Sequence, residues 1–194
     1  MRWTVFALAA YAALALQVGL ARHVSLGSAQ PQIVLLLAVF VALSAPTRTA
    51  VVACGILGLF MDLLASPYVL AATATLEPAP QAATILGPYT LGYMAGGYLV
   101  VQLRPMLFRH HPLTMAAMAL AAGAEAHLLV VGLLWLRNWY EPIEGFIASA
   151  ELGVRGLGLL YTAGLGLLLA YPAKWITPAF AFHTGKHSGR GQGG

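Results

Sequence analysis

The chain is a succession of long apolar segments separated by short turns. A helix needs ~20 mostly apolar residues to cross a bilayer, with a range of ~17–25. None of the segments alternates apolar and polar positions with a period of two, so they predict helices rather than barrel strands. Six segments approach or reach the spanning length, at about residues 3–20, 31–45, 49–66, 83–103, 112–136 and 152–171, the second being short.

Proline marks many of the ends of these segments. Proline suits a first helical turn and stops a helix at its far end. The stretch 67–81 has an apolar middle that is too short to span, which indicates a re-entrant or interfacial segment. We therefore predict a six-helix transmembrane domain over residues 1–175. Residues 176–194, basic and glycine-rich, predict a disordered cytoplasmic tail.

The composition agrees with an all-α integral membrane protein. Apolar residues form 60% of the 194 residues and charged residues 8%, against the usual ~45–50% and ~25%. So few polar side chains cannot cover a soluble globule, and mean hydropathy is +0.80. The composition excludes a disordered chain, a nucleic-acid-binding domain and a disulfide scaffold; Cys54 is the single cysteine. The first segment could also be a secretion signal, but its apolar run is long for a signal core.

The basic residues predict the orientation. With six spans, seven of the ten Lys and Arg fall on one side and three on the other, so the positive-inside rule places both termini in the cytoplasm. The four acids in loops were not used in this choice, and all fall outside. The cytoplasmic set is Arg2, Arg48, Arg104, Arg109, Lys174, Lys186 and Arg190; the outer set is Arg22, Arg137 and Arg155, with Glu77, Glu141, Glu144 and Glu151.

Two acids lie inside predicted spans, Asp62 and Glu125. A charge in hydrocarbon costs ~2.5–3.5 kcal/mol on insertion scales, so both are candidates for function. Asp62 is one turn from the outer end of its span, whereas Glu125 is near the middle and should be paired, protonated or turned toward other helices. Arg155 is the nearest basic candidate partner for either acid. A structural pair, a ligand or proton site, and contact with a partner's helix all remain open.

Other chemistry is weak. His127 is two residues from Glu125, about 200° around a helix, so the two do not form a dyad. The chain lacks a nucleophile with a nearby base, a metal-spaced carboxylate cluster and a nucleotide loop, so we expect no enzymatic activity and no cofactor. Small residues recur at helix-packing spacing in two spans and predict close helix approach, either within the chain or with a partner. These residues are Gly55, Gly58, Gly92 and Gly96.

Two sequence stretches resemble the rod shape-determining protein MreD family. One is Pro31 followed by apolar residues 33–37 and then Gly55-x-x-Gly58-x-x-x-Asp62-Leu63-Leu64. The other is the glycine-rich run 86–99, which ends at a basic loop. The resemblance covers about residues 30–135, and the six-span plan extends it. It departs in spacing, since the family usually has a short turn between this Asp and the next Leu-Gly, whereas Asp62 and Gly87 are 25 residues apart.

This resemblance implies a non-enzymatic membrane subunit of the cell-elongation machinery in the inner membrane. Its implied partners are MreC, a single-span protein, with the MreB filament, RodA and penicillin-binding protein 2 in the same peptidoglycan-synthesis complex. The family's fold is similar to the substrate-binding subunits of energy-coupling-factor transporters. The alternative is therefore a small-molecule-binding, vitamin-type transporter subunit, with Asp62, Glu125 and Arg155 lining the site. If the chain is instead an MreD-like subunit, the resemblance implies that the MreC helix binds through the small-residue faces.

Overall fold

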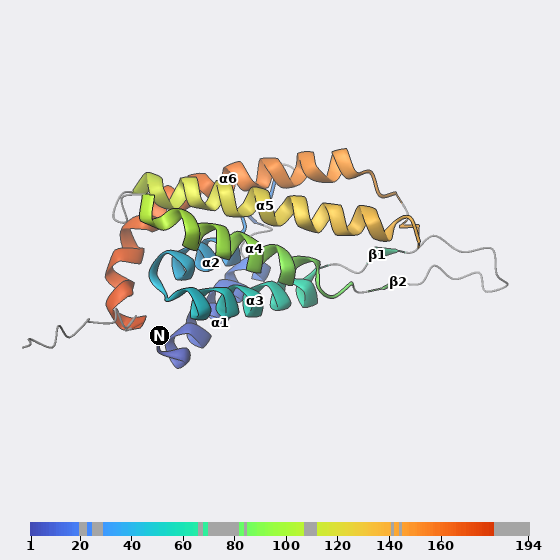
Figure 1. The fold of residues 1–194 in the computed structure, drawn as a ribbon. Helices are drawn as coiled ribbons and strands as arrows, with labels where there is room; N and C mark the ends of the chain where they lie inside the picture. The colour runs from blue at the N-terminus through green and yellow to red at the C-terminus, as the bar shows by residue number, and fades with distance from the viewer. Residues whose placement is uncertain are drawn as a thin grey trace, which may run out of the picture.

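The computed structural model describes residues 1–19, 23–24, 29–65, 68–69, 82–83, 85–106, 112–140, 142–143 and 145–180. This part of the chain is helical, with one short two-stranded antiparallel pairing of β1 with β2 (Figure 1). Each of the six predicted apolar segments holds one α-helix. The elements are α1 Trp3–Gly19, α2 Ile33–Ser44, α3 Thr47–Leu64, β1 Tyr68–Val69, β2 Ala82–Ala83, α4 Pro88–Leu103, η1 Arg104–Met106, α5 Pro112–Arg137, α6 Ala148–Ile176 and η2 Thr177–Phe180.

Three helices are long and apolar enough to cross a membrane: α3, α5 and residues Ala148–Ala173 of α6. The other three are shorter. At about 1.5 Å per residue, the 12 residues of α2 extend only about 18 Å, well below the ~30 Å of a hydrocarbon core. The chain therefore has the helices of a membrane protein, and the segment predicted to be short at residues 31–45 is the shortest of the six described helices.

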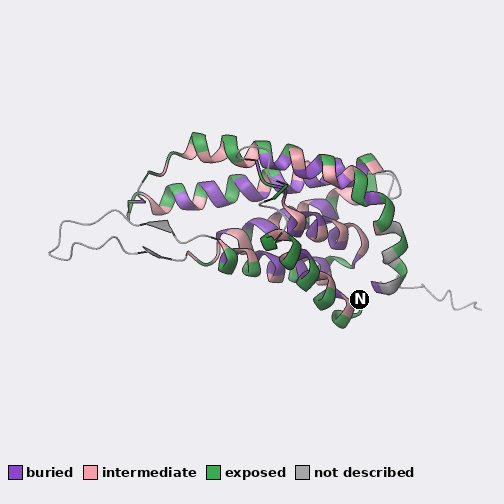
Figure 2. Ribbon diagram, turned by 180° about the vertical axis from the view of Figure 1, so that it is seen from behind, coloured by how far each residue is buried: buried purple, intermediate pink, exposed green. Residues whose placement is uncertain are grey.

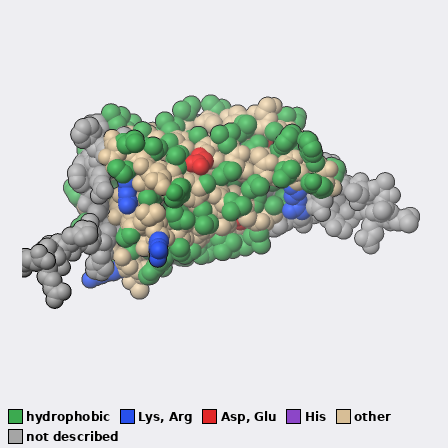
Figure 3. All heavy atoms as spheres, viewed as in Figure 1, with side chains coloured by type: hydrophobic (Ala, Val, Ile, Leu, Met, Phe, Trp, Pro, Cys, Tyr) green, Lys and Arg blue, Asp and Glu red, His purple; other side chains and the backbone are tan. Residues whose placement is uncertain are grey.

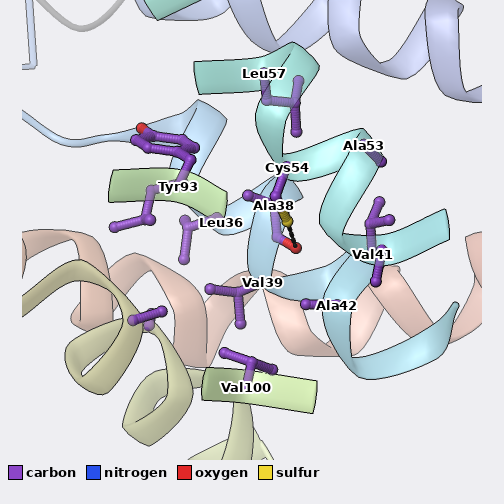
Figure 4. Packing of buried hydrophobic residues seen from close by; sticks show 14 of the residues in the cluster. Leu36, Ala38, Val39, Val41, Ala42, Ala53, Cys54, Leu57, Tyr93 and Val100 are labelled. Atoms are coloured by element: carbon purple, nitrogen blue, oxygen red, sulfur yellow. Dashed lines mark hydrogen bonds between the residues drawn. The ribbon is translucent and has the colours of Figure 1, made fainter. Parts of the chain in front are cut away.

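The short helix α2 lies at the centre of the bundle. It contacts α1, α3, α4, α5 and α6. An apolar helix without a polar face is buried on all sides, and most of α2 is inaccessible, as its purple ribbon shows (Figure 2). Its side chains interdigitate with those of α3 and α4 (Figure 4). There the Cys54 thiol donates to the carbonyl oxygen of Ala38 on α2, 3.6 Å away.

Because α2 begins and ends inside the protein, other elements must satisfy its terminal backbone groups. At its start, the side-chain oxygen of Gln17 accepts from the Ile33 N–H at 2.7 Å, and the Thr162 hydroxyl accepts from the Gln32 N–H at 2.9 Å. Just after its end, Arg104 donates to the carbonyl oxygen of Ala45 at 2.6 Å. Side chains from α1, α6 and η1 thus cap α2 at both ends.

The two ends of the described chain meet at one end of the bundle. Pro172 lies inside α6, and the last part of this helix turns with η2 across the end of the other helices (Figure 1). Phe180 is buried there against Phe40, and its carbonyl accepts from the Arg2 N–H at 2.9 Å. Described structure therefore continues to Phe180, so the predicted boundary at residue 175 was too early. Residues 181–194 lie outside the described residues.

The surface in Figure 3 is mostly apolar. Basic side chains lie toward the two ends of the bundle, and one acidic group stands alone on the face between them. Many large apolar side chains are exposed in this way, as lipid contact requires of a spanning bundle.

Candidate functional site

Asp62 lies near the end of α3 and has no exposed surface. Its carboxylate accepts four hydrogen bonds from the start of α4. Oδ2 accepts from the backbone N–H groups of Gly87 and Thr90, both at 2.9 Å, and from the Thr90 hydroxyl at 2.6 Å. Oδ1 accepts from the Tyr89 N–H at 2.9 Å. Asp62 therefore caps a helix that begins 26 residues after it in the sequence.

The local sequence explains why α4 begins at this carboxylate. Gly87 has a backbone φ of +120°, a conformation that residues other than glycine rarely adopt. Pro88 follows at the first helical position, where its fixed φ suits the helix and its missing N–H costs nothing. The first N–H groups of a helix lack internal acceptors and carry a partial positive charge, which an anion stabilises. Asp62 supplies that anion.

Arg155 joins this cluster through Tyr89. Its Nη1 donates to the Tyr89 hydroxyl at 2.5 Å, and its guanidinium lies 5.5 Å from the centroid of the same ring. Its Nε also pairs with Glu151, one turn earlier in α6, at 3.0 Å. All four hydrogen bonds to Asp62 come from the start of α4, so Arg155, the candidate partner for either acid, does not bond Asp62 directly. Tyr89 connects the two residues instead.

Glu125 does not join this cluster. It is half-buried on α5, and its Oε2 is inaccessible and has no hydrogen-bond partner. The structure therefore separates Asp62 and Arg155, which lie in one polar cluster, from Glu125, which stands apart. His127, two residues later, is buried on another side of α5, in agreement with the predicted angular separation.

His127, Tyr93 and Gln32 also carry buried polar atoms without a hydrogen-bond partner. These atoms include both ring nitrogens of His127, the hydroxyl of Tyr93 and the side-chain oxygen of Gln32. Tyr93 and His127 are 1% and 3% exposed, so bulk solvent does not reach them. Each such atom costs about 1–3 kcal/mol if it stays unsatisfied.

The four glycines singled out in the sequence all lie at contacts between helices. A Cβ on Gly58 would come within 2.5 Å of the Tyr89 carbonyl oxygen on α4, and one on Gly55 within 3.1 Å of Met94. A Cβ on Gly92 or Gly96 would come within 2.8 and 2.6 Å of carbonyl oxygens on α5. These glycines hold α3, α4 and α5 together, which is the internal one of the two kinds of packing that their spacing left open.

Several predicted loop residues, and the part of the predicted tail after Phe180, lie outside the described residues. In the described ranges, no three or more His, Cys, Asp or Glu side chains gather as metal ligands would. The undescribed loop residues are Arg22, Glu77, Arg109, Glu141 and Glu144, and the tail includes Lys186 and Arg190.

Comparison with known proteins adds no relative, since no protein-family model, curated protein or solved structure matches this chain.

Sequence reasoning missed the polar residues that cap α2. Gln17, Gln32 and Thr162 are single polar residues in or beside apolar segments, and Arg104 counted only as a topogenic charge. One signal was available. A predicted helix too short to span must end within protein, so its terminal N–H and C=O groups require polar side chains from neighbouring spans.

Proposed function

We propose that this chain is a non-enzymatic, six-pass scaffold subunit of the inner membrane, of the MreD type, with both termini in the cytoplasm. In this role it binds MreC within the cell-elongation complex that contains MreB, RodA and penicillin-binding protein 2. The observation that carries the proposal is the structural role of Asp62. The acid in the glycine-rich stretch that resembles the family accepts four hydrogen bonds as a cap for α4.

The other described polar groups support the same role. Arg104, Gln17 and Thr162 fasten the ends of α2, and the glycines bring α3, α4 and α5 into backbone contact. A bundle fastened in this way offers a rigid platform whose outer surface is apolar. With six spans, seven of the ten Lys and Arg residues fall on one side of the membrane and three on the other. The backbone hydrogen bond between Arg2 and Phe180 brings the two ends of the described chain together.

Affinity purification of the tagged chain in a mild detergent, followed by mass spectrometry, tests this proposal. We expect MreC to co-purify in near-stoichiometric amount from a rod-shaped host, and RodA with penicillin-binding protein 2 in smaller amount. Recovery of no MreC, with the bundle intact by circular dichroism, contradicts the proposal.

A second candidate function rests on the unpartnered interior atoms of Tyr93, His127 and Gln32. A small polar molecule could satisfy these groups, as in a binding subunit of a transporter. Native mass spectrometry of the purified chain separates the two candidates. A retained small molecule, lost in a His127→Leu variant while MreC is absent, favours the second.

A further inference from the structure

Glu125 has no stabilising partner in the described bundle. It lies 13 residues after the start of the 26-residue helix α5 and 12 before its end. At about 1.5 Å per residue, it is about 18–20 Å from either end, so its carboxyl cannot reach the headgroups. No hydrogen bond or ion pair reaches it from a described side chain, and its buried Oε2 has no donor. An acid at this depth normally faces a partner or a cavity.

The surroundings of Glu125 suit close approach by another helix. On its exposed side, α5 carries a strip of small residues at helical spacing, and a Cβ added to Gly132 would meet no atom within 4 Å. Small residues let two backbones approach, so that a polar group on one helix reaches a polar group on the other. The exposed or half-exposed small residues are Ala117, Ala121 and Ala124 before Glu125 and Gly132 two turns after it, with the exposed Leu128 between Ala124 and Gly132.

We infer that the α5 face around Glu125 binds a transmembrane helix of another protein that carries a hydrogen-bond donor, such as lysine, at mid-depth. Charge complementarity selects this occupant, since a cationic donor stabilises the carboxylate and a neutral donor still bonds the protonated acid. A second copy of this chain would bring another carboxyl to this position and no cationic donor. The inference rests on the membrane-spanning bundle of the proposed function but does not depend on MreC.

Energy transfer in lipid vesicles tests the inference with the full chain. The probes are two labelled 23-residue leucine–alanine transmembrane peptides, one with a central lysine and one with leucine at that position. We expect the lysine peptide to bind the wild-type chain about ten-fold more tightly, a difference of about 1.4 kcal/mol. Glu125→Leu should abolish the preference and Glu125→Gln should retain part of it.

Leu160→Ala is the matched control, because Leu160 is an apolar residue that is 62% exposed on a different helix, α6. It should leave the preference unchanged. Equal binding of both peptides to the wild-type chain, or a preference that survives Glu125→Leu, overturns the inference. So does energy transfer between copies of this chain that Glu125→Leu removes, which would assign the face to a second copy. If MreC co-purifies undiminished with the Glu125→Leu chain, the proposed function stands and MreC is not the occupant.

Discussion

Substitution of Asp62 tests the interhelical cap directly. Asp62→Ala leaves three N–H groups and one hydroxyl without their acceptor at a site with no solvent exposure. Each hydrogen bond to a charged group contributes about 1.5–3 kcal/mol. If water satisfies half of the four groups after substitution, the loss in the free energy of unfolding is about 3–6 kcal/mol. This exceeds the ~0.5–2 kcal/mol of an ordinary N-cap because the site is buried.

The two carboxylate oxygens predict a graded series. Oδ2 accepts three bonds and Oδ1 one, so an asparagine whose amide oxygen takes the Oδ2 place keeps three and faces its NH₂ against the Tyr89 N–H. Asp62→Asn should therefore cost about 1–3 kcal/mol. Thr90→Val, which removes only the hydroxyl bond, should cost about 1.5 kcal/mol.

Unfolding in mixed micelles, with increasing dodecyl sulfate and far-ultraviolet circular dichroism as the signal, measures the series. We expect the order wild type, then Thr90→Val and Asp62→Asn, with Asp62→Ala the least stable. An alanine variant within about 0.5 kcal/mol of wild type would refute the cap as a stabilising element, since ordinary surface changes stay within that range.

Three further substitutions test other contacts by the same unfolding assay. Gly58→Ala should cost about 1–3 kcal/mol because its Cβ meets α4 backbone, whereas the control Gly132→Ala should gain about 0.5–1 kcal/mol; a Gly58→Ala chain as stable as the Gly132→Ala chain would contradict the Gly58 contact. Arg104→Ala should cost about 1.5–3 kcal/mol by uncapping α2, and an unchanged midpoint would contradict this. His127→Leu should be neutral or stabilising because no described hydrogen bond is lost; a loss above about 2 kcal/mol would reveal an interior ligand or water.

The helices could be predicted from sequence because lipid leaves a simple signal, a long apolar run between breakers. Asp62 and Glu125 could be selected for the same reason, since an acid in such a run is costly. Their surroundings could not be predicted. Asp62 accepts its hydrogen bonds because the chain returns to it at Gly87, 25 residues later in the sequence. No local sequence pattern predicts that return.

The glycine contacts show the same limit. Their spacing indicates a packing face, but the same spacing fits an internal neighbour or a separate protein. Only the three-dimensional arrangement decides that Gly92 and Gly96 lie against α5. The boundary near residue 175 failed for a related reason. The tail composition begins near there, whereas Phe180 is held by tertiary contacts with Phe40 and Arg2.

The membrane topology is the most direct test of a multi-pass bundle with cytoplasmic termini, and Cys54 makes it simple. This single cysteine is fully buried, so the native chain should not react with an impermeant maleimide. Trp139→Cys, 68% exposed after α5, and Trp175→Cys, 86% exposed near the end of α6, place one reactive thiol at each end. In intact spheroplasts of a Gram-negative host, we expect Trp139→Cys to react at once and Trp175→Cys only after the membrane is permeabilised. The reverse pattern, or equal labelling of both in intact spheroplasts, would contradict the topology.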